Sequence, residues 1–233
     1  MKLSIIIPVF NEGKTIDQVL KNVRKVNLKG YSTEIIVVDD ASTDETLSIL
    51  EKWQRKVKII SHDLNLGKGA AVRDGIKNSS GDLIIIQDAD LEYDPGYYSV
   101  LLKPISQGAR VVYGTRLLNY PLNFWGKNKT VLPLHLIANK FLTTLTNILY
   151  GSYLTDMETG YKVFRKDILQ KIDIRSNGFD FEAEITAKIL KQGIKIIEVP
   201  IVTRPRGYSE GKKIGWIDGV LAIWTLVKYR FID

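Results

Sequence analysis

Short apolar runs alternate with helical patterns over the first 115 residues of the chain. Runs typical of buried strands occur at Leu3–Val9, Glu34–Asp39, Val57–Ser61, Leu83–Asp88 and Arg110–Tyr113. The spacing of apolar residues between these runs predicts helices at Thr15–Val26, Asp44–Gln54, Gly69–Asn78 and Gly96–Gln107. This alternation predicts an α/β fold, with a mostly parallel sheet, right-handed crossovers and flanking helices.

The regular alternation stops beyond Gly114. There the pattern predicts an apolar helix at Val131–Tyr150, an extended piece at Gly160–Phe164, a helix at Phe179–Gln192, a strand at Ile194–Val199 and a last helix at Ile214–Phe231. The last helix is amphipathic, and its apolar face holds Ile217, Val220, Leu221, Trp224, Val227 and Phe231.

The two apolar helices of this second half are too polar to cross a membrane. A span needs roughly 20 nearly uncharged residues, whereas the first helix contains His135 and Lys140 and the last contains Asp218 and Lys228. Two interpretations remain open for both helices. They are ordinary core helices packed on the sheet, or they lie in a membrane interface with Trp, Lys and Arg at headgroup level.

Length and composition place the chain among single-domain proteins, with or without a tail. It has 233 residues, 45% of them hydrophobic, which is enough for a full core. The chain has no cysteine, which excludes a disulfide framework and a thiolate metal site. It enters a strand at once, without the basic segment and apolar core of a signal peptide, so we expect a cytoplasmic protein.

The net charge of +7 has its origin in the middle of the chain. No acidic residue occurs between Asp94 and Asp156, while the same segment holds Lys103, Arg110, Arg116, Lys127, Lys129 and Lys140. A segment of one sign favours an anionic partner. These basic residues are spread among Leu, Ile and Phe instead of lining an aromatic stacking platform, so we expect no nucleic acid. An anionic membrane surface or a lipid phosphate fits better.

Polar clusters follow three of the predicted strands. Asp88-Ala89-Asp90 comes after the apolar run Leu83–Ile86, and strand alternation would point both carboxylates at one hard cation. The other clusters are Asn11-Glu12 and the segment Asp39–Asp44. Acidic residues after a strand can also be simple turn formers. However, ligands of open α/β sheets bind at the carboxyl ends of strands, so three clusters predict one shared site.

Five sequence elements occur in an order and spacing that resemble family 2 glycosyltransferases of the GT-A fold. They are Ile7-Pro8-Val9-Phe10-Asn11-Glu12, Asp39-Asp40-Ala41-Ser42-Thr43-Asp44, Asn65-Leu66-Gly67-Lys68-Gly69-Ala70, Gln87-Asp88-Ala89-Asp90-Leu91-Glu92 and Gly114-Thr115-Arg116. More narrowly, they resemble dolichyl-phosphate or polyprenyl-phosphate mannose and glucose synthases. The resemblance implies a Rossmann-like sheet in a catalytic domain, 1–213, with a donor half, 1–115, and an acceptor half, 116–213. Residues 214–233 would then form an amphipathic, candidate membrane-docking tail.

The resemblance implies a nucleotide-sugar donor held by the first half. Pro8 and Phe10 would form a wall for the base. The residues that would bind the ribose hydroxyls and base N–H groups, or position those that do, are Asn11, Glu12, Asp39, Asp40 and Ser42. Asn11 and Asp40 could instead merely terminate strands. In the loop before the third helix, Gly67 would let backbone N–H groups approach phosphate, with Lys68 as a point charge. Arg204 and Lys212 lie in a glycine-hinged basic loop that contacts donor phosphates in the family.

The same resemblance implies a divalent cation, Mg or Mn, held by Asp88, Asp90 and Glu92. Arg116 would bind the acceptor phosphate, with Lys127 and Lys129 near it, although mannose synthases have a second arginine soon after this position. The block Leu154–Lys162 resembles the glucosyl branch more than the mannosyl branch. We therefore name four candidate catalytic residues: Asp90, Arg116, Asp156 and Glu184.

The family implies inversion at the anomeric carbon by direct displacement. A phosphate monoester has a second pKa near ~6, so a lipid-phosphate acceptor needs no catalytic base. A glycan or other hydroxyl acceptor would need one, for which Asp156 or Glu184 is available. A nucleotidyltransferase and a non-catalytic binding module are weaker alternatives. UDP-glucose and GDP-mannose both remain open as donors, as do a partner membrane subunit and a homo-oligomer.

Overall fold

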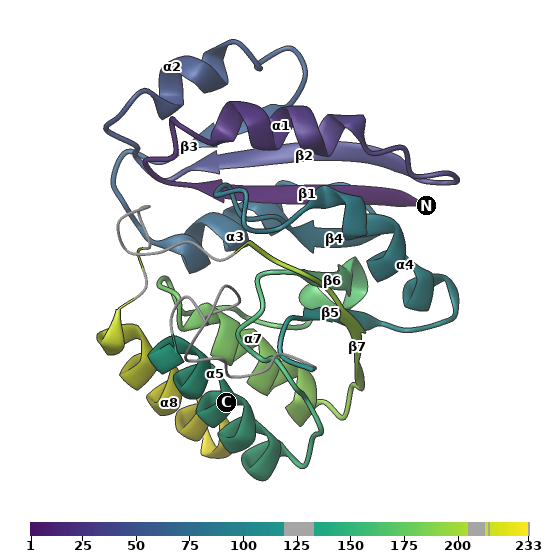
Figure 1. Ribbon diagram of the computed structural model, residues 1–233, viewed down its shortest axis with the longest axis vertical. Coiled ribbons are helices and arrows are strands. Elements are labelled where there is room, and N and C mark those ends of the chain that lie inside the picture. The colour runs from purple at the N-terminus through teal and green to yellow at the C-terminus, as the bar shows by residue number, and fades with distance from the viewer. Residues whose placement is uncertain (119–132, 205–212, 214, 233) are drawn as a thin grey trace, which may run out of the picture.

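The computed structural model of the chain describes residues 1–118, 133–204, 213 and 215–232. The strands are β1 (Lys2–Val9), β2 (Ser32–Asp39), β3 (Lys58–Ser61), β4 (Leu83–Ile86), β5 (Val111–Thr115), β6 (Lys162–Arg165) and β7 (Ile196–Pro200). The helices are α1 (Ile16–Lys25), α2 (Thr46–Glu51), α3 (Lys68–Lys77), the 3-10 turn η1 (Pro95–Tyr97), α4 (Tyr98–Ser106), α5 (Pro133–Tyr150), α6 (Lys166–Leu169), α7 (Phe181–Lys191) and α8 (Trp216–Phe231) (Figure 1).

One mixed sheet runs through the molecule in the order β3-β2-β1-β4-β6-β5-β7. β1 pairs in parallel with β2 and β4, β2 with β3, and β5 with β7. β6 is antiparallel to both of its neighbours, β4 and β5. The predicted mostly parallel α/β sheet is therefore confirmed. The insertion of one antiparallel strand in its centre was not predicted.

Helices cover both faces of this sheet, as a buried parallel sheet requires. Alternate residues of β1 show the two faces: Ile5 and Ile7 belong to the core cluster with α1 and α4, whereas Ile6 belongs to the cluster with α3 and α7. α5 and α8 lie beyond α7 on that second face, where they contact each other (Figure 1).

Several predicted boundaries are wrong. β4 ends at Ile86, so Asp88 and Asp90 lie in a turn, where Leu91 has a φ of 64°. The argument from strand alternation therefore does not apply to this pair. α2 is only six residues long, much shorter than predicted. α6 was not predicted. The extended piece predicted at Gly160–Phe164 is observed as β6, which begins two residues later.

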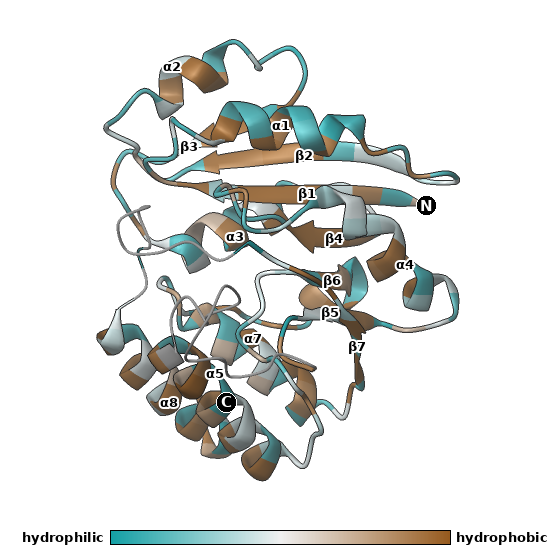
Figure 2. Cartoon of the chain, in the orientation of Figure 1, coloured by the Kyte–Doolittle hydropathy of each residue, from teal (hydrophilic) through white to brown (hydrophobic). Residues whose placement is uncertain are grey.

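α5 and α8 combine a packed side with an exposed apolar side. α8 buries Ala222, Leu226 and Tyr229, and the Tyr150 hydroxyl of α5 donates to the Leu226 carbonyl at 2.7 Å. The face predicted to be apolar points outward. We call the exposed apolar side chains of the two helices the α5/α8 apolar face; they are Leu134, Ile137, Phe141, Ile148, Trp216, Ile217, Val220, Leu221, Trp224 and Phe231. Figure 2 shows that hydrophobic residues recur along both helices. In the described part of the chain, no helix has the length and apolar character needed to cross a membrane.

Candidate functional site

A cavity of about 380 Å³ lies at the carboxyl ends of β1, β2 and β4. The predicted site residues that line it are Pro8, Phe10, Glu12, Asp40, Gly67, Lys68, Asp88, Asp90, Glu92 and Arg116. Among the described residues, the predicted ones that are not part of its lining are Asn11, Asp39, Ser42, Asp156, Glu184 and Arg204. Lys127, Lys129 and Lys212 lie outside the described residues. The three predicted clusters thus meet at one site.

Unusual backbone conformations mark the loops around this cavity. Among the described residues, three that are not glycine have positive φ: Asn11 (50°), Ala41 (61°) and Leu91 (64°). Asn11 and Ala41 belong to two of the polar clusters, and Leu91 directly follows the third. Conformations of this kind cost free energy and occur often at functional sites. All three are chain neighbours of residues that line the cavity, which supports the assignment of the site.

Asn11, Asp39 and Ser42 shape the loops after β1 and β2. The Asn11 N–H donates to the Ser42 hydroxyl at 2.9 Å, and the Asn11 side-chain oxygen accepts from the Thr43 N–H at 2.7 Å. The Ser42 hydroxyl donates to the Asp39 carboxylate at 2.5 Å. Because these groups bond to one another, the three residues position the loops and do not face the cavity.

Asp40 anchors the loop that follows β3. Its two carboxylate oxygens accept the N–H groups of Leu66 and Gly67 at 2.8 and 2.7 Å. The Nδ1 atom of His62 lies 2.7 Å from the same carboxylate, and the Nε2 atom of His62 lies 3.1 Å from Asp74. Asp40 therefore holds this loop against the sheet edge as well as lining the cavity.

The glycine-rich loop does not form the expected backbone cradle for phosphate. The N–H groups of Gly69 and Ala70 donate to the Asn177 carbonyl at 2.7 and 3.2 Å. The N–H groups of Leu66 and Gly67 donate to Asp40, so four N–H groups of the loop are already bonded within the protein. Gly67 has a φ of +99°, and a Cβ there would collide with the Asn177 carbonyl. These glycines allow close approach of the 174–178 segment. The loop presents the Lys68 ammonium to the cavity instead.

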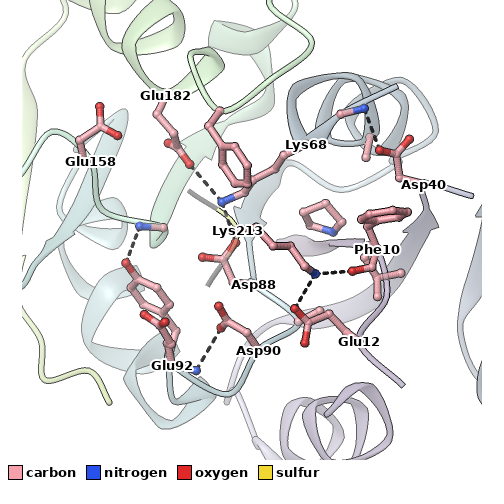
Figure 3. Close-up of a pocket in the computed structure, with 18 of the residues that line it drawn as sticks. Phe10, Glu12, Asp40, Lys68, Asp88, Asp90, Glu92, Glu158, Glu182 and Lys213 are labelled. Atoms are coloured by element: carbon pink, nitrogen blue, oxygen red, sulfur yellow. Dashed lines mark hydrogen bonds and ion pairs between the residues drawn. The ribbon is translucent and has the colours of Figure 1, made fainter. Parts of the chain in front are cut away.

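The Lys68 ammonium lies between the carboxylates of Asp88 and Glu182. Its Nζ lies 2.7 Å from Asp88 and 3.4 Å from Glu182, and Glu182 also binds the fully buried Lys162 (Figure 3). Burial alone would lower the pKa of Lys68, but the neighbouring carboxylates raise it above its usual value. Lys68 is therefore a permanent cation on the cavity wall, suited to an anionic ligand.

The turn that carries Asp88 and Asp90 is held rigidly by Gln87. The Gln87 amide donates to the carbonyls of Asp88 and Tyr93, at 3.0 and 3.2 Å, and its oxygen accepts the hydroxyls of Tyr98 and Tyr161. The hydroxyl of Tyr93 accepts the Gly160 N–H at 2.7 Å. This network fixes the turn against the segment before β6.

Asp88, Asp90 and Glu92 line the same cavity, but in the described part of the chain no group of three acidic or histidine side chains is placed to hold a metal ion. The predicted three-residue site is therefore not preformed. Oxygen ligands still fit a hard cation, because Mg²⁺ usually takes one or two carboxylates and completes its shell with substrate phosphates and water. The residues fit such an ion together with a diphosphate.

Arg116 lines the cavity while its guanidinium grips Asp156. The Nε and Nη2 atoms donate to the two Asp156 oxygens at 2.7 and 2.8 Å, and the Arg116 N–H adds a bond of 2.9 Å. Glu198 accepts the N–H groups of Thr155 and Asp156 and so fixes this turn. Burial alone would lower the pKa of Arg116, but Asp156 raises it well above its usual value. With both oxygens bonded, Asp156 is a positioning residue.

Glu184 is placed away from the cavity lining. Its buried carboxylate accepts the N–H groups of Arg175 and Ser176, at 3.0 and 2.6 Å, and lies 2.7 Å from the Lys188 ammonium. The sequence reasoning preferred Glu184 over Glu182, but the structure places Glu182 in the lining. Nearly all of α7 is buried, so the pattern of apolar residues does not indicate which side of this helix faces the cavity.

Sequence reasoning also missed lining residues of the second half. His135 and Asn139 reach the cavity from α5, and their spacing of four on an apolar helix was a usable signal. Lys213 pairs with Glu12 at 2.8 Å and also donates to the Phe10 carbonyl. Glu158 lies in the lining too, and burial followed by the charge of Glu182 raises its pKa to about 7.

Comparisons with known proteins identify relatives along the whole chain. The sequence profile of glycosyl transferase family 2 matches residues 4–173. An uncharacterized protein of Methanocaldococcus jannaschii is 31% identical over 98% of this chain and 92% of its own length. Dolichol-phosphate mannosyltransferase of Pyrococcus furiosus is 30% identical over 99% of this chain and 65% of its own length. UDP-N-acetylglucosamine–dolichyl-phosphate N-acetylglucosaminyltransferase of Methanococcus voltae is 30% identical over 97% of this chain and 95% of its own length.

Solved structures support the fold. Glucosyl-3-phosphoglycerate synthase of Mycobacterium tuberculosis, in complex with Mn²⁺, UDP and phosphoglyceric acid, superposes with a TM-score of 0.76 at 19% identity. The match covers 100% of this chain and 79% of that one. A second structure of the same synthase, with Mg²⁺ and UDP, gives a TM-score of 0.74 at 21% identity and covers 100% of this chain and 80% of that one. At this identity the likeness shows a shared GT-A-like fold.

Proposed function

Because the chain belongs to glycosyl transferase family 2, whose members use nucleotide-sugar donors, we propose that it moves a hexose from UDP-glucose or GDP-mannose to a polyprenyl (dolichyl-type) phosphate. Two relatives named for dolichyl-phosphate acceptors support this class of acceptor. Their sugars differ, which leaves the sugar of this enzyme open. We further propose that transfer proceeds with inversion and takes place at the cytoplasmic face of a membrane.

The donor lies across the cavity from the β1 end toward the middle of the site. Pro8, Phe10 and Glu12 contact the nucleoside, and the Lys68 ammonium neutralises the diphosphate. The backbone N–H of Arg204 donates to the Glu92 carbonyl at 3.0 Å, which holds Arg204 beside the turn that carries Asp88 and Asp90. Arg204 and Lys212 remain proposed phosphate contacts.

Asp90, with Asp88 and Glu92, would hold a Mg or Mn ion together with the donor diphosphate. A bound ion of this kind neutralises the charge that develops on the leaving nucleotide, which is worth several kcal/mol. Asp88 is already paired with Lys68, so Asp90 is the main protein ligand in this proposal. Gln87 contributes by fixing the turn that presents both carboxylates.

The fixed pairing of Asp156 favours a phosphate acceptor over a hydroxyl acceptor. A hydroxyl must lose a proton to a base as it attacks, but Asp156 is fully buried with both oxygens bonded to Arg116, and Glu184 is not in the lining. A phosphate monoester is mostly dianionic at neutral pH and needs no base. Arg116, on the cavity wall, supplies positive charge where that phosphate would attack.

α5 carries the observation that best supports a lipid acceptor. His135 and Asn139 of this helix line the cavity, while Leu134, Ile137 and Phe141 of the same helix are exposed and belong to the α5/α8 apolar face. A polar head can thus occupy the cavity while an isoprenoid tail follows the apolar side of the helix. We propose that this face rests on an anionic membrane surface, with Lys140 and Arg230 exposed near it.

Transfer to matched lipids tests this function. The enzyme is incubated with Mn²⁺ and labelled UDP-glucose or GDP-mannose, and with either a short polyprenyl phosphate or the same polyprenol without its phosphate. We expect glycolipid only from the phosphate. Equal transfer to the polyprenol, or to a soluble sugar alcohol, would support the alternative of a hydroxyl acceptor.

A further inference from the structure

Glu158 has a buried carboxylate oxygen without a partner. Among the described residues, its Oε1 is the one buried side-chain N or O atom that lacks a hydrogen-bond partner. Leaving a polar atom in this state costs free energy, and buried polar groups of folded proteins nearly always have partners. The exception needs an explanation, and its place in the cavity lining suggests that a ligand supplies the partner.

The charged neighbours of Glu158 are engaged with one another. Lys162 donates to Glu182 and to the Thr159 carbonyl, and Arg116 donates to both oxygens of Asp156. None of these contacts satisfies the Oε1 atom of Glu158. The pKa of Glu158, raised to about 7 by burial and by Glu182, agrees with a carboxyl group that the protein leaves without full compensation.

The position of Glu158 matches the sugar end of the donor. Figure 3 shows Glu158 beside Glu182, across Lys68 and Asp88 from Phe10 and Asp40. With the nucleoside at Phe10 and the diphosphate at Lys68, the hexose extends toward Glu158. A hexose is rich in hydroxyl groups, each of which can donate a hydrogen bond to a carboxylate.

We propose that Glu158 accepts a hydrogen bond from a hydroxyl group of the donor hexose and thereby selects the sugar. This inference rests on the proposed function, because it places the nucleotide sugar in the cavity. A site built to bond a hydroxyl discriminates strongly against an analogue that lacks it, since the buried protein group is then left unpaired. Glu158 is therefore a specificity residue for the sugar, with no contact to the nucleoside.

Calorimetry with and without the sugar isolates this contact. Wild type, Glu158→Ala and Glu158→Gln are titrated in Mn²⁺ with UDP, UDP-glucose, GDP and GDP-mannose. For the nucleotide sugar that wild type binds, we expect Glu158→Ala to weaken affinity about tenfold, the value of one hydrogen bond. Glu158→Gln should lose less, because its amide oxygen still accepts. Affinity for the matching nucleoside diphosphate should not change in either variant.

Deoxy analogues of the same donor identify the hydroxyl group. One monodeoxy analogue should bind wild type as weakly as the complete donor binds Glu158→Ala. The Glu158→Ala variant should bind this analogue and the complete donor with equal affinity. Glu51→Gln, an exposed change on α2, serves as the charge-matched control and should bind all ligands as wild type does.

Two different failures remain distinguishable. If wild type binds neither UDP nor GDP, the proposed function fails. If wild type binds a nucleotide sugar and both Glu158 variants bind it equally well, the proposed function stands and the sugar contact is overturned. Unchanged donor affinity with reduced turnover would also overturn it, because Glu158 would then act in a step after donor binding.

Discussion

Arg116 and Asp156 form a two-point ion pair at the edge of the cavity, with N–O distances of 2.7 and 2.8 Å. Asp156 is fully buried, whereas Arg116 reaches the cavity wall. The pair thus fixes the orientation of an arginine that lines the cavity. It also means that a change at either residue affects folding and function together.

Arg116→Ala should destabilise the fold by about 3–5 kcal/mol, because it leaves the Asp156 carboxylate buried without its counter-ion. Urea unfolding followed by circular dichroism measures this. The double variant Arg116→Met/Asp156→Leu should recover most of the stability, since no unpaired charge remains, but should not recover transfer to polyprenyl phosphate. A double variant as unstable as Arg116→Ala would show that the pair is not the source of the effect.

Gly67→Ala should be more damaging than Gly30→Ala. Both glycines have positive φ, +99° and +83°, which alanine rarely adopts, so both substitutions carry a backbone strain of about 1–3 kcal/mol. A Cβ at Gly67 also collides with the Asn177 carbonyl, whereas a Cβ at Gly30 meets nothing within 4 Å. We expect an additional loss of about 1–3 kcal/mol for Gly67→Ala. Equal losses in urea unfolding would contradict the close approach of the two loops.

The effect of Glu158→Gln on stability should depend on pH, because the pKa of the native Glu158 side chain is raised. Below the ordinary value of 4.5 the carboxyl is neutral in both folded and unfolded chains, and between 4.5 and about 7 only the unfolded chain ionises. The wild type therefore loses stability as the pH rises through this window. Burial and the charges of Glu182 and Asp156 oppose ionisation of Glu158, whereas the charges of Lys162 and Arg116 favour it. Glutamine has no such penalty.

The difference in Tm between Glu158→Gln and wild type should thus increase from pH 4.5 to 7 and stay constant above that range. Thermal unfolding followed by circular dichroism at several pH values measures it. A difference independent of pH would show that the Glu158 carboxyl is not held in its neutral form.

Leu134→Ser/Trp224→Ser should weaken binding to anionic vesicles by about tenfold or more, since it removes two large apolar side chains from the α5/α8 apolar face. Both are exposed, at 79% and 62%, so the fold should be unaffected. Leu47→Ser/Val100→Ser, at exposed apolar positions of α2 and α4, is the matched control. Deleting residues 214–233 is a less clean test, because α8 buries Leu226 and Tyr229 in the core. Equal vesicle flotation of the two double variants would contradict a membrane role for this face.

The sequence predicted the features that depend on short-range patterns. Apolar runs located β1 to β5. Polar clusters after β1, β2 and β4 predicted a common site, and residues of all three clusters line one cavity. The family and its α/β fold followed from motifs that are continuous in the chain. Local patterning is sufficient for these features because strand ends and loops are encoded by adjacent residues.

Features that depend on long-range contacts were not predicted. β6 pairs with β4, about 80 positions earlier in the chain, and with β5, about 50 positions earlier, and no local pattern encodes such pairings. Asn177, more than 100 residues away, occupies the N–H groups expected to bind phosphate. Glu158 was missed for the same reason: its lack of a partner becomes visible only when Arg116, Lys162 and Glu182 are seen bonded to other groups.

The most direct test of the central claim is calorimetric titration of UDP and GDP, with Mn²⁺ or with EDTA, into wild type and Asp90→Asn. We expect wild type to bind one of the two nucleotides in Mn²⁺ and to lose affinity in EDTA. Asp90→Asn should bind it at least about tenfold more weakly in Mn²⁺, with an unchanged circular dichroism spectrum and Tm. Equal affinity of both proteins, with Mn²⁺ and with EDTA alike, would contradict a metal-assisted nucleotide site at Asp90.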